Sequence, residues 1–188
     1  ALNTHLAGAA AVVSTILLCA FTGRPPLLSA IVNGSLGGLV AITAPCAYVS
    51  PGAAVLIGAV AGLIVPLGNF LLDVFQVDDA VGAIPVHGGC GVWGTIAVGV
   101  FKDGVLSPTQ VGVQALGCAV AFGVAFPAAF VMYKVIGWVV GTRVTTVDEQ
   151  RGLDFSEHHE VGYPEFQKDL MHAGADADDA DLNAAGRN

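Results

Sequence analysis

Five long apolar segments dominate the sequence, and short breaks containing charged or turn-forming residues separate them. A helix needs about 20 mostly apolar residues to cross the hydrocarbon core of a bilayer. The segments lie near residues 1–21, 27–46, 52–75, 82–101 and 111–140. Inside lipid, each backbone polar group must find a partner within the protein, which a helix provides. The sequence therefore predicts an all-α, polytopic transmembrane helical bundle with five spans, occupying residues 1–143.

The charged residues set a second region apart from this bundle. Only 12% of the chain is charged and its mean hydropathy is +0.72, whereas a soluble domain carries about 25% charged residues. Most of the charges fall after residue 143, where the net charge is acidic. We expect residues 144–188 to form a polar tail that is disordered near 169–188. The chain has no cluster of Lys and Arg, so nucleic-acid binding is not expected.

Basic residues indicate the orientation of the spans. Arg24 follows the first segment, while Lys134, Arg143 and Arg151 lie at or after the end of the fifth. The positive-inside rule then predicts an external N-terminus and a cytoplasmic C-terminus, with Lys102 as the exception. We expect a multi-pass protein of the cell membrane.

Small residues recur within the predicted spans. Gly34 and Gly38, and likewise Gly58 and Gly62, have the G-x-x-x-G spacing that lets helices approach closely in lipid. Close packing within one bundle is the favoured interpretation, and a dimer face is the alternative.

His87 is the main candidate for a functional side chain. It lies in the apolar stretch "AIPVHGGCGVWG", about 8 Å along a helix that starts near Gly82. Ionisable groups at such depth usually face a bundle interior or a cavity. A neutral imidazole has one donor and one acceptor nitrogen, so it can relay a proton. The alternative is a structural histidine bonded to a neighbouring carbonyl.

Other chemistry finds little support in the sequence. His87 and Cys90 are three residues apart, but a structural zinc site needs about four ligands and no second cluster is visible in the spans. No known catalytic motif is recognisable. We therefore expect no enzyme activity, no metal and no cofactor. Asp78 and Asp79 precede the fourth segment, where acidic residues favour a helix start.

Several stretches resemble the ammonium transporter family (Amt/Mep/Rh), in its bacterial and archaeal branch. The match to its seventh helix is "LNTHLAGAAA". The eighth and ninth helices resemble "GRPPLLSAIVNGSLGGLVAITAPCAYVSPGAAVLIGAVAGLIV", and the tenth resembles "VDDAVGAIPVHGGCGVWGTIAVGVF". The cytoplasmic tail of the family resembles "RVTTVDEQRGLDFSEHHEVGY". Together these matches cover roughly residues 1–166, in the family's order and spacing.

This resemblance implies a homotrimer with one hydrophobic pore in each subunit, through which ammonium or ammonia crosses the bilayer. His87 matches the second of two pore histidines that share a hydrogen bond. Ammonium would lose its proton on entry, and ammonia and the proton would then cross along the histidine pair. K⁺ has no proton to lose, so a dry pore excludes it. The resemblance also places Ala83, Ile84 and Val86 toward the cytoplasmic exit and Thr43 facing the pore.

The resemblance also assigns a regulatory role to the tail. In the family, this region packs against a neighbouring subunit and lies near the docking site of nitrogen-regulatory PII proteins. The matched positions are Arg143, Glu149, Gly152, Asp154, His158 and Tyr163.

The first pore histidine and the external aromatic recruitment site would precede Ala1. We therefore expect the chain to be the C-terminal part of a longer protein, and we expect that it would not conduct alone. One alternative is a truncated, non-conducting membrane sensor or regulatory module. Another is an unrelated five-helix membrane protein.

Overall fold

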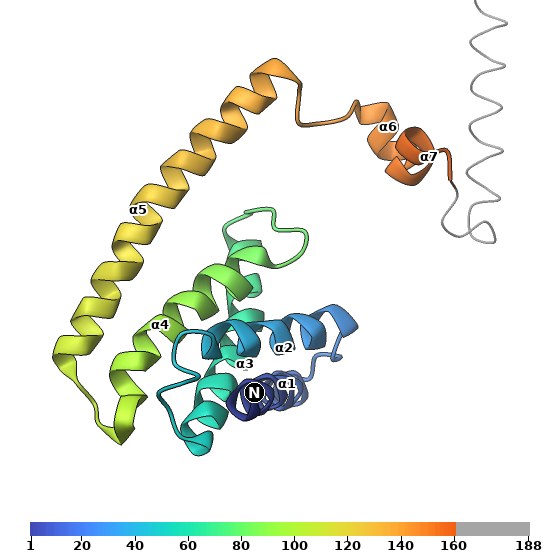
Figure 1. Ribbon diagram of the computed structural model, residues 1–188. Helices are drawn as coiled ribbons and strands as arrows, with labels where there is room; N and C mark the ends of the chain where they lie inside the picture. The colour runs from blue at the N-terminus through green and yellow to red at the C-terminus, as the bar shows by residue number, and fades with distance from the viewer. Residues whose placement is uncertain (161–188) are drawn as a thin grey trace, which may run out of the picture. The chain divides into compact units, whose positions relative to one another are not determined.

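The computed structural model describes residues 1–160, and within them all regular structure is helical (Figure 1). The long helices are α1 (Leu2–Thr22), α2 (Leu28–Ile42), α3 (Pro51–Val74), α4 (Cys90–Phe101) and α5 (Pro108–Val139). A π-helical segment, Ile84–Gly89, leads directly into α4, and a 3-10 turn, Lys102–Gly104, follows it. The all-α prediction is confirmed, and the helix ends agree with the predicted segments to within a few residues.

Four helical stretches in the described part have the length and composition to cross a membrane. They are Leu2–Thr22, Pro51–Val74, Ile84–Gly104 and Pro108–Val139. The second predicted segment gives a shorter helix, because α2 has 15 residues and ends at Ile42. Pro45 has no amide hydrogen, so the chain turns there instead of continuing the helix. The Cys46 amide donates to the Ile42 carbonyl at 2.9 Å within this turn.

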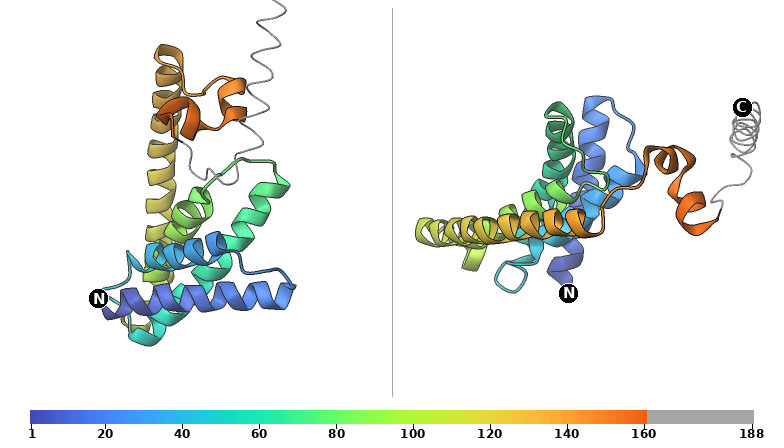
Figure 2. Two further views of the ribbon diagram at one scale, coloured as in Figure 1. Left: turned by 90° about the vertical axis from the view of Figure 1, so that its right-hand side faces the viewer. Right: turned by 90° about the horizontal axis from the view of Figure 1, so that it is seen from above.

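The chain divides into two compact units, one comprising residues 1–127 and the other beginning at Ala128. The boundary lies within α5 and divides the chain by packing alone. The end of the membrane domain at residue 143 stays a prediction. In the first unit, α1 packs against α2 and α3, and α2 also packs against α4 (Figures 1 and 2). The second unit contains the rest of α5 and two short helices, α6 (Thr146–Arg151) and α7 (Leu153–His158).

Glycine determines how closely the helices of the first unit approach. A Cβ atom on Gly58 would collide with the backbone of Ala7, and one on Gly38 would lie 2.6 Å from the Cβ of Ala11. Gly94 makes the same kind of contact between α4 and the backbone of Ala41. The glycines of the G-x-x-x-G pairs therefore pack against other helices of the same bundle, as the favoured interpretation predicted.

The core of the first unit is small-residue rich and contains one polar side chain. Ala7, Ala41, Ile57, Ala61 and Val65 are fully buried, and Thr15 is buried among them. The Thr15 hydroxyl donates to the Gly62 carbonyl at 2.8 Å. All four cysteines are free thiols.

Candidate functional site around His87

The π-helical segment carries His87, and Asp79 holds the start of this segment. The two carboxylate oxygens of Asp79 accept hydrogen bonds from the amides of Ala83 and Ile84, both at 2.8 Å. Pro85 has no amide hydrogen, and the Val86 amide donates to the Gly82 carbonyl at 3.2 Å. The first amides of the segment are thus satisfied within the protein and do not depend on water. The prediction of an acidic cap is confirmed for Asp79.

These hydrogen bonds also change the acidity of Asp79. Its pKa lies below the usual value of 3.8, mainly because the Ile84 amide donates to the charged carboxylate. Burial opposes this shift, and the amides of Ala83 and Gly82 add to it. The carboxylate is therefore charged at neutral pH, the form that serves as a double acceptor.

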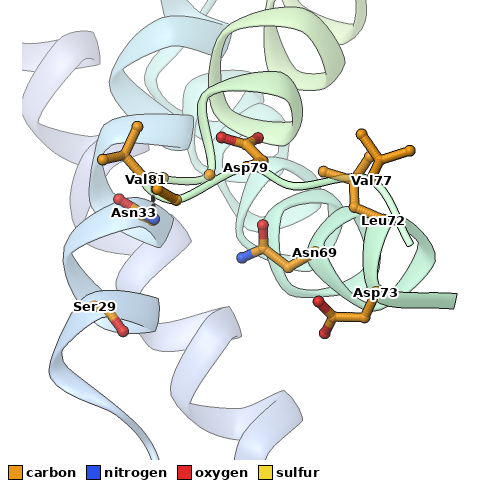
Figure 3. Close-up of a pocket in the computed structure, with 10 residues that line it drawn as sticks. Ser29, Asn33, Asn69, Leu72, Asp73, Val77, Asp79 and Val81 are labelled. Carbon is orange, nitrogen blue, oxygen red and sulfur yellow. Dashed lines mark hydrogen bonds between the residues drawn. The ribbon is translucent and has the colours of Figure 1, made fainter. Parts of the chain in front are cut away.

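A polar hollow of about 160 Å³ lies beside this cap, and Figure 3 shows its lining residues. Asn33 of α2 donates from Nδ2 to the Val81 carbonyl at 2.8 Å, which ties the loop before the π-helical segment to α2. Gly82 adopts φ +73°, and a Cβ there would lie 2.8 Å from Nδ2 of Asn33. The close approach and the positive φ both require glycine at this position. The remaining polar lining residues are Ser29, Asn69 and Asp73.

Buried residues fix how the segment and α4 face the rest of the bundle. Val86 and Cys90 lie in the core, and Cys90 Sγ is 3.6 Å from the Ala61 carbonyl. The indole of Trp93 donates to the Ile57 carbonyl at 3.0 Å. Pro85 is also buried and packs against α3, where Gly68 leaves room for it. This arrangement directs Val86 into the core.

His87 lies next to that buried face and is exposed. Its imidazole has no hydrogen-bond partner among residues 1–160, and a Cβ on the adjacent Gly88 would meet no atom within 4 Å. Space is therefore open beside the ring at Gly88, whereas a Cβ on Gly89 would lie 3.0 Å from the Ile64 side chain. A ring with both nitrogens available can donate and accept hydrogen bonds.

The other predicted pore residues differ in their exposure: Ala83 and Thr43 are exposed, and Val86 is buried. Ala83 is exposed on the same segment as His87, whereas Val86 is only 2% exposed and belongs to the core. Thr43 is exposed at the end of α2, and its hydroxyl donates to the Leu39 carbonyl at 2.9 Å. Gly94 lies seven residues, or roughly 10 Å, beyond His87 along the helix. Ala41 packs on Gly94, so Thr43, two residues after Ala41, lies near that level and not beside His87.

The described tail residues Arg143, Glu149, Asp154 and His158 are exposed, and Gly152 is half-buried. Nη2 of Arg143 lies 3.0 Å from both carboxylate oxygens of Glu149. Gly152, with φ +91°, connects α6 to α7, which contains Asp154 and His158. Tyr163 lies outside the described residues.

Sequence reasoning missed two contributors to this site, Asn33 and Gly68. Asn33 binds the Val81 carbonyl, and Gly68 makes room for the side chain of Pro85. Their position on helices that bracket the loop is visible only in three dimensions.

Comparison with known proteins places these features in a family. The family model described as "Ammonium Transporter Family" matches residues 1–163. The chain is 41% identical over 180 residues to ammonium transporter Amt2 of Archaeoglobus fulgidus, covering 87% of this chain and 38% of that protein. It is 37% identical over 161 residues to ammonium transporter Amt1 of Haloferax mediterranei, covering 85% of this chain and 31% of that protein. The chain thus spans well under half the length of these relatives.

A solved structure shows the same fold. The protein named "Sensor Amt Protein" superposes with a TM-score of 0.76 at 36% identity, over 83% of this chain and 40% of that one. Membrane-spanning helices, the extent of the family match and these relatives lead to the same conclusion: the chain belongs to the ammonium transporter family.

Proposed function

We propose that this chain forms the C-terminal part of an ammonium channel or transporter, and that His87 is one of two pore histidines. The observation that carries the proposal is the exposed imidazole of His87, which has no hydrogen-bond partner among residues 1–160 and directly follows the buried residues Pro85 and Val86. Asp79 and Asn33 satisfy and anchor the backbone before it, so the ring projects from a fixed support. The second histidine would come from the part of the protein that precedes this chain.

The chemistry of this arrangement favours ammonia over metal cations. A neutral imidazole accepts a hydrogen bond at one nitrogen and donates one from the other. Paired imidazoles in a dry pore can therefore pass a proton while ammonia moves beside them. An ion that keeps its charge loses its hydration without compensation in such a pore, which costs it far more than ammonia.

Around this pore we propose the remaining features of the assembly. The whole protein forms a homotrimer in the cell membrane with a cytoplasmic C-terminus. Ala83 lines the exit beside His87, and Thr43 is a secondary lining position, whereas the core position of Val86 removes it from the lining. Arg143, Glu149, Gly152, Asp154, His158 and Tyr163 form a regulatory tail that is available to a PII-type protein. The exposure of Arg143, Glu149, Asp154 and His158 supports this assignment.

A sensor module is the second candidate function. It is favoured by the likeness to the protein named "Sensor Amt Protein". Such a module would bind ammonium at the same site without sustaining its flux across the bilayer.

Growth and uptake separate these functions. The full-length protein containing this chain is expressed in a host without ammonium uptake, and growth on low ammonium is compared between the wild type and His87→Ala. Transport predicts growth of the wild type and loss of growth in the variant at equal membrane abundance. Equal growth of both rejects the role of His87, and growth of neither favours the sensor.

A further inference from the structure

A second hollow, far from His87 in sequence, lies between the C-terminal end of α1 and the second half of α3. It has a volume of about 320 Å³ and is lined by Leu18, Cys19, Thr22, Arg24, Pro66, Leu67 and Phe70. Thr22 contributes little polarity, because its hydroxyl donates to the Leu18 carbonyl of its own helix at 2.8 Å. Apart from Arg24, the hollow is therefore an apolar groove.

The groove opens because close helix packing ends there. Nearer the start of α3, Gly58 and Gly62 let this helix contact the backbone of α1. One turn later α3 presents Pro66, and then Phe70, in place of glycine. Side chains of this size hold the helices apart, since only small residues permit backbone contact.

Arg24 stands at the mouth of the groove in a fixed position. Gly23, in the left-handed conformation with φ 67°, ends α1, and the Arg24 amide donates back to the Cys19 carbonyl at 3.0 Å. This is the Schellman arrangement, which fixes the residue after the glycine. The guanidinium carbon lies 5.6 Å from the centre of the Phe70 ring. A guanidinium held over an aromatic face keeps its N–H edge available to an anion.

No carboxylate neutralises this charge, because Arg24 has no ion-pair partner among residues 1–160. It is also the only Lys or Arg in the first 101 residues. The groove flanks two membrane-spanning helices and the cation stands beyond the last turn of one of them. An isolated cation at the end of an apolar groove complements a ligand with an anionic head and an apolar chain.

We propose that this groove binds an anionic glycerophospholipid, with its phosphate on Arg24 and the start of one acyl chain between α1 and α3. Three lining residues lie on each helix, from Leu18 to Thr22 and from Pro66 to Phe70. Each set spans roughly 6 Å along its helix axis, which suits the first methylenes of a chain. Guanidinium and phosphate form paired, charge-assisted hydrogen bonds. A free phosphate would leave the apolar lining unused, so a lipid fits the site better.

Site-specific crosslinking tests this proposal on the full-length protein that contains this chain. The probe is a phosphatidylglycerol with a diazirine near the carbonyl end of one acyl chain, and mass spectrometry maps its adducts. We expect adducts within residues 18–22 and 66–70, reduced about fivefold by Arg24→Gln, as one basic residue at a membrane surface contributes. Unlabelled phosphatidylglycerol should compete, whereas phosphatidylcholine and glycerol phosphate should not.

Lys102→Gln is the matched control, because Lys102 also stacks over an aromatic ring, 5.4 Å from the centre of Tyr48. It removes the same charge and should leave the adducts unchanged. Equal labelling of Arg24→Gln and the wild type overturns the proposal, as does equal competition by phosphatidylcholine. Adducts that fall only outside residues 18–22 and 66–70 would overturn it as well. The readout does not involve transport, so its outcome is independent of the role proposed for His87.

Discussion

The Thr15 hydroxyl on α1 donates a 2.8 Å hydrogen bond to the Gly62 carbonyl on α3. Within α3 that carbonyl would accept from the amide of residue 66, but Pro66 has none. A side chain from another helix thus replaces a missing backbone donor. In lipid this replacement matters, since water cannot satisfy the carbonyl.

Thr15→Val should therefore destabilise the first unit without changing the shape of the core. Losing the donor leaves a buried carbonyl unsatisfied, at a cost of about 1–3 kcal/mol. The apparent melting temperature in detergent, followed by circular dichroism, measures this effect. Thr15→Ser retains the hydroxyl and should lose less stability. Thr43→Val is the exposed control, and a loss there as large as that of Thr15→Val would contradict the account.

Replacing Gly58 by Leu should prevent α1 and α3 from packing. The new side chain would meet the backbone of Ala7, which cannot move without moving the helix. We expect a large loss of folded protein, measured as the monodisperse fraction in size-exclusion chromatography. Gly112→Leu on α5 is the matched control, because a Cβ at Gly112 meets no atom within 4 Å. Equal yields for the two variants would show that α1 and α3 do not need this contact.

The Asp79 cap predicts a pH dependence of stability. The pKa of Asp79 is lowered in the folded state by the Ile84 amide, so the folded protein prefers the charged carboxylate. Its stabilisation is present above the unfolded pKa and disappears as the pH falls through the lower folded pKa. The stability difference between the wild type and Asp79→Asn should thus shrink below pH 3.8. A difference that grows on acidification would have the wrong sign.

The ion pair of Arg143 and Glu149 should affect regulation rather than folding. Their side chains are 79% and 46% exposed, and exposed pairs contribute little to stability. We expect Arg143→Ala in the full-length protein to leave the melting temperature unchanged while altering ammonium uptake. The exchanged pair, Arg143→Glu with Glu149→Arg, should restore part of the wild-type uptake. A clear fall in the melting temperature of Arg143→Ala would contradict this prediction and assign the ion pair a structural role.

Much of the fold follows from hydropathy alone, because each apolar segment must be helical in lipid. The acidic cap and the glycine packing follow from local spacing. The π-helical segment could not be predicted, since it depends on Asp79, Asn33 and the contact of Pro85 with Gly68 together. The burial of Val86 beside the exposed His87 depends on which face α4 turns toward α2 and α3. Pro66 within an apolar segment could have been used as a signal. Because proline has no amide hydrogen, the carbonyl of Gly62, four residues earlier, needs another hydrogen-bond donor.

Ammonium flux through the reconstituted full-length protein tests the central claim most directly. Proteoliposomes carrying the wild type, His87→Ala or His5→Ala are given an inward ammonium gradient, and the internal pH is followed. His5 is an exposed histidine on α1 and serves as the matched control. The account predicts flux in the wild type and in His5→Ala, and at least a tenfold loss in His87→Ala, equivalent to about 1.4 kcal/mol in the barrier. Wild-type flux in His87→Ala at equal protein density would contradict it.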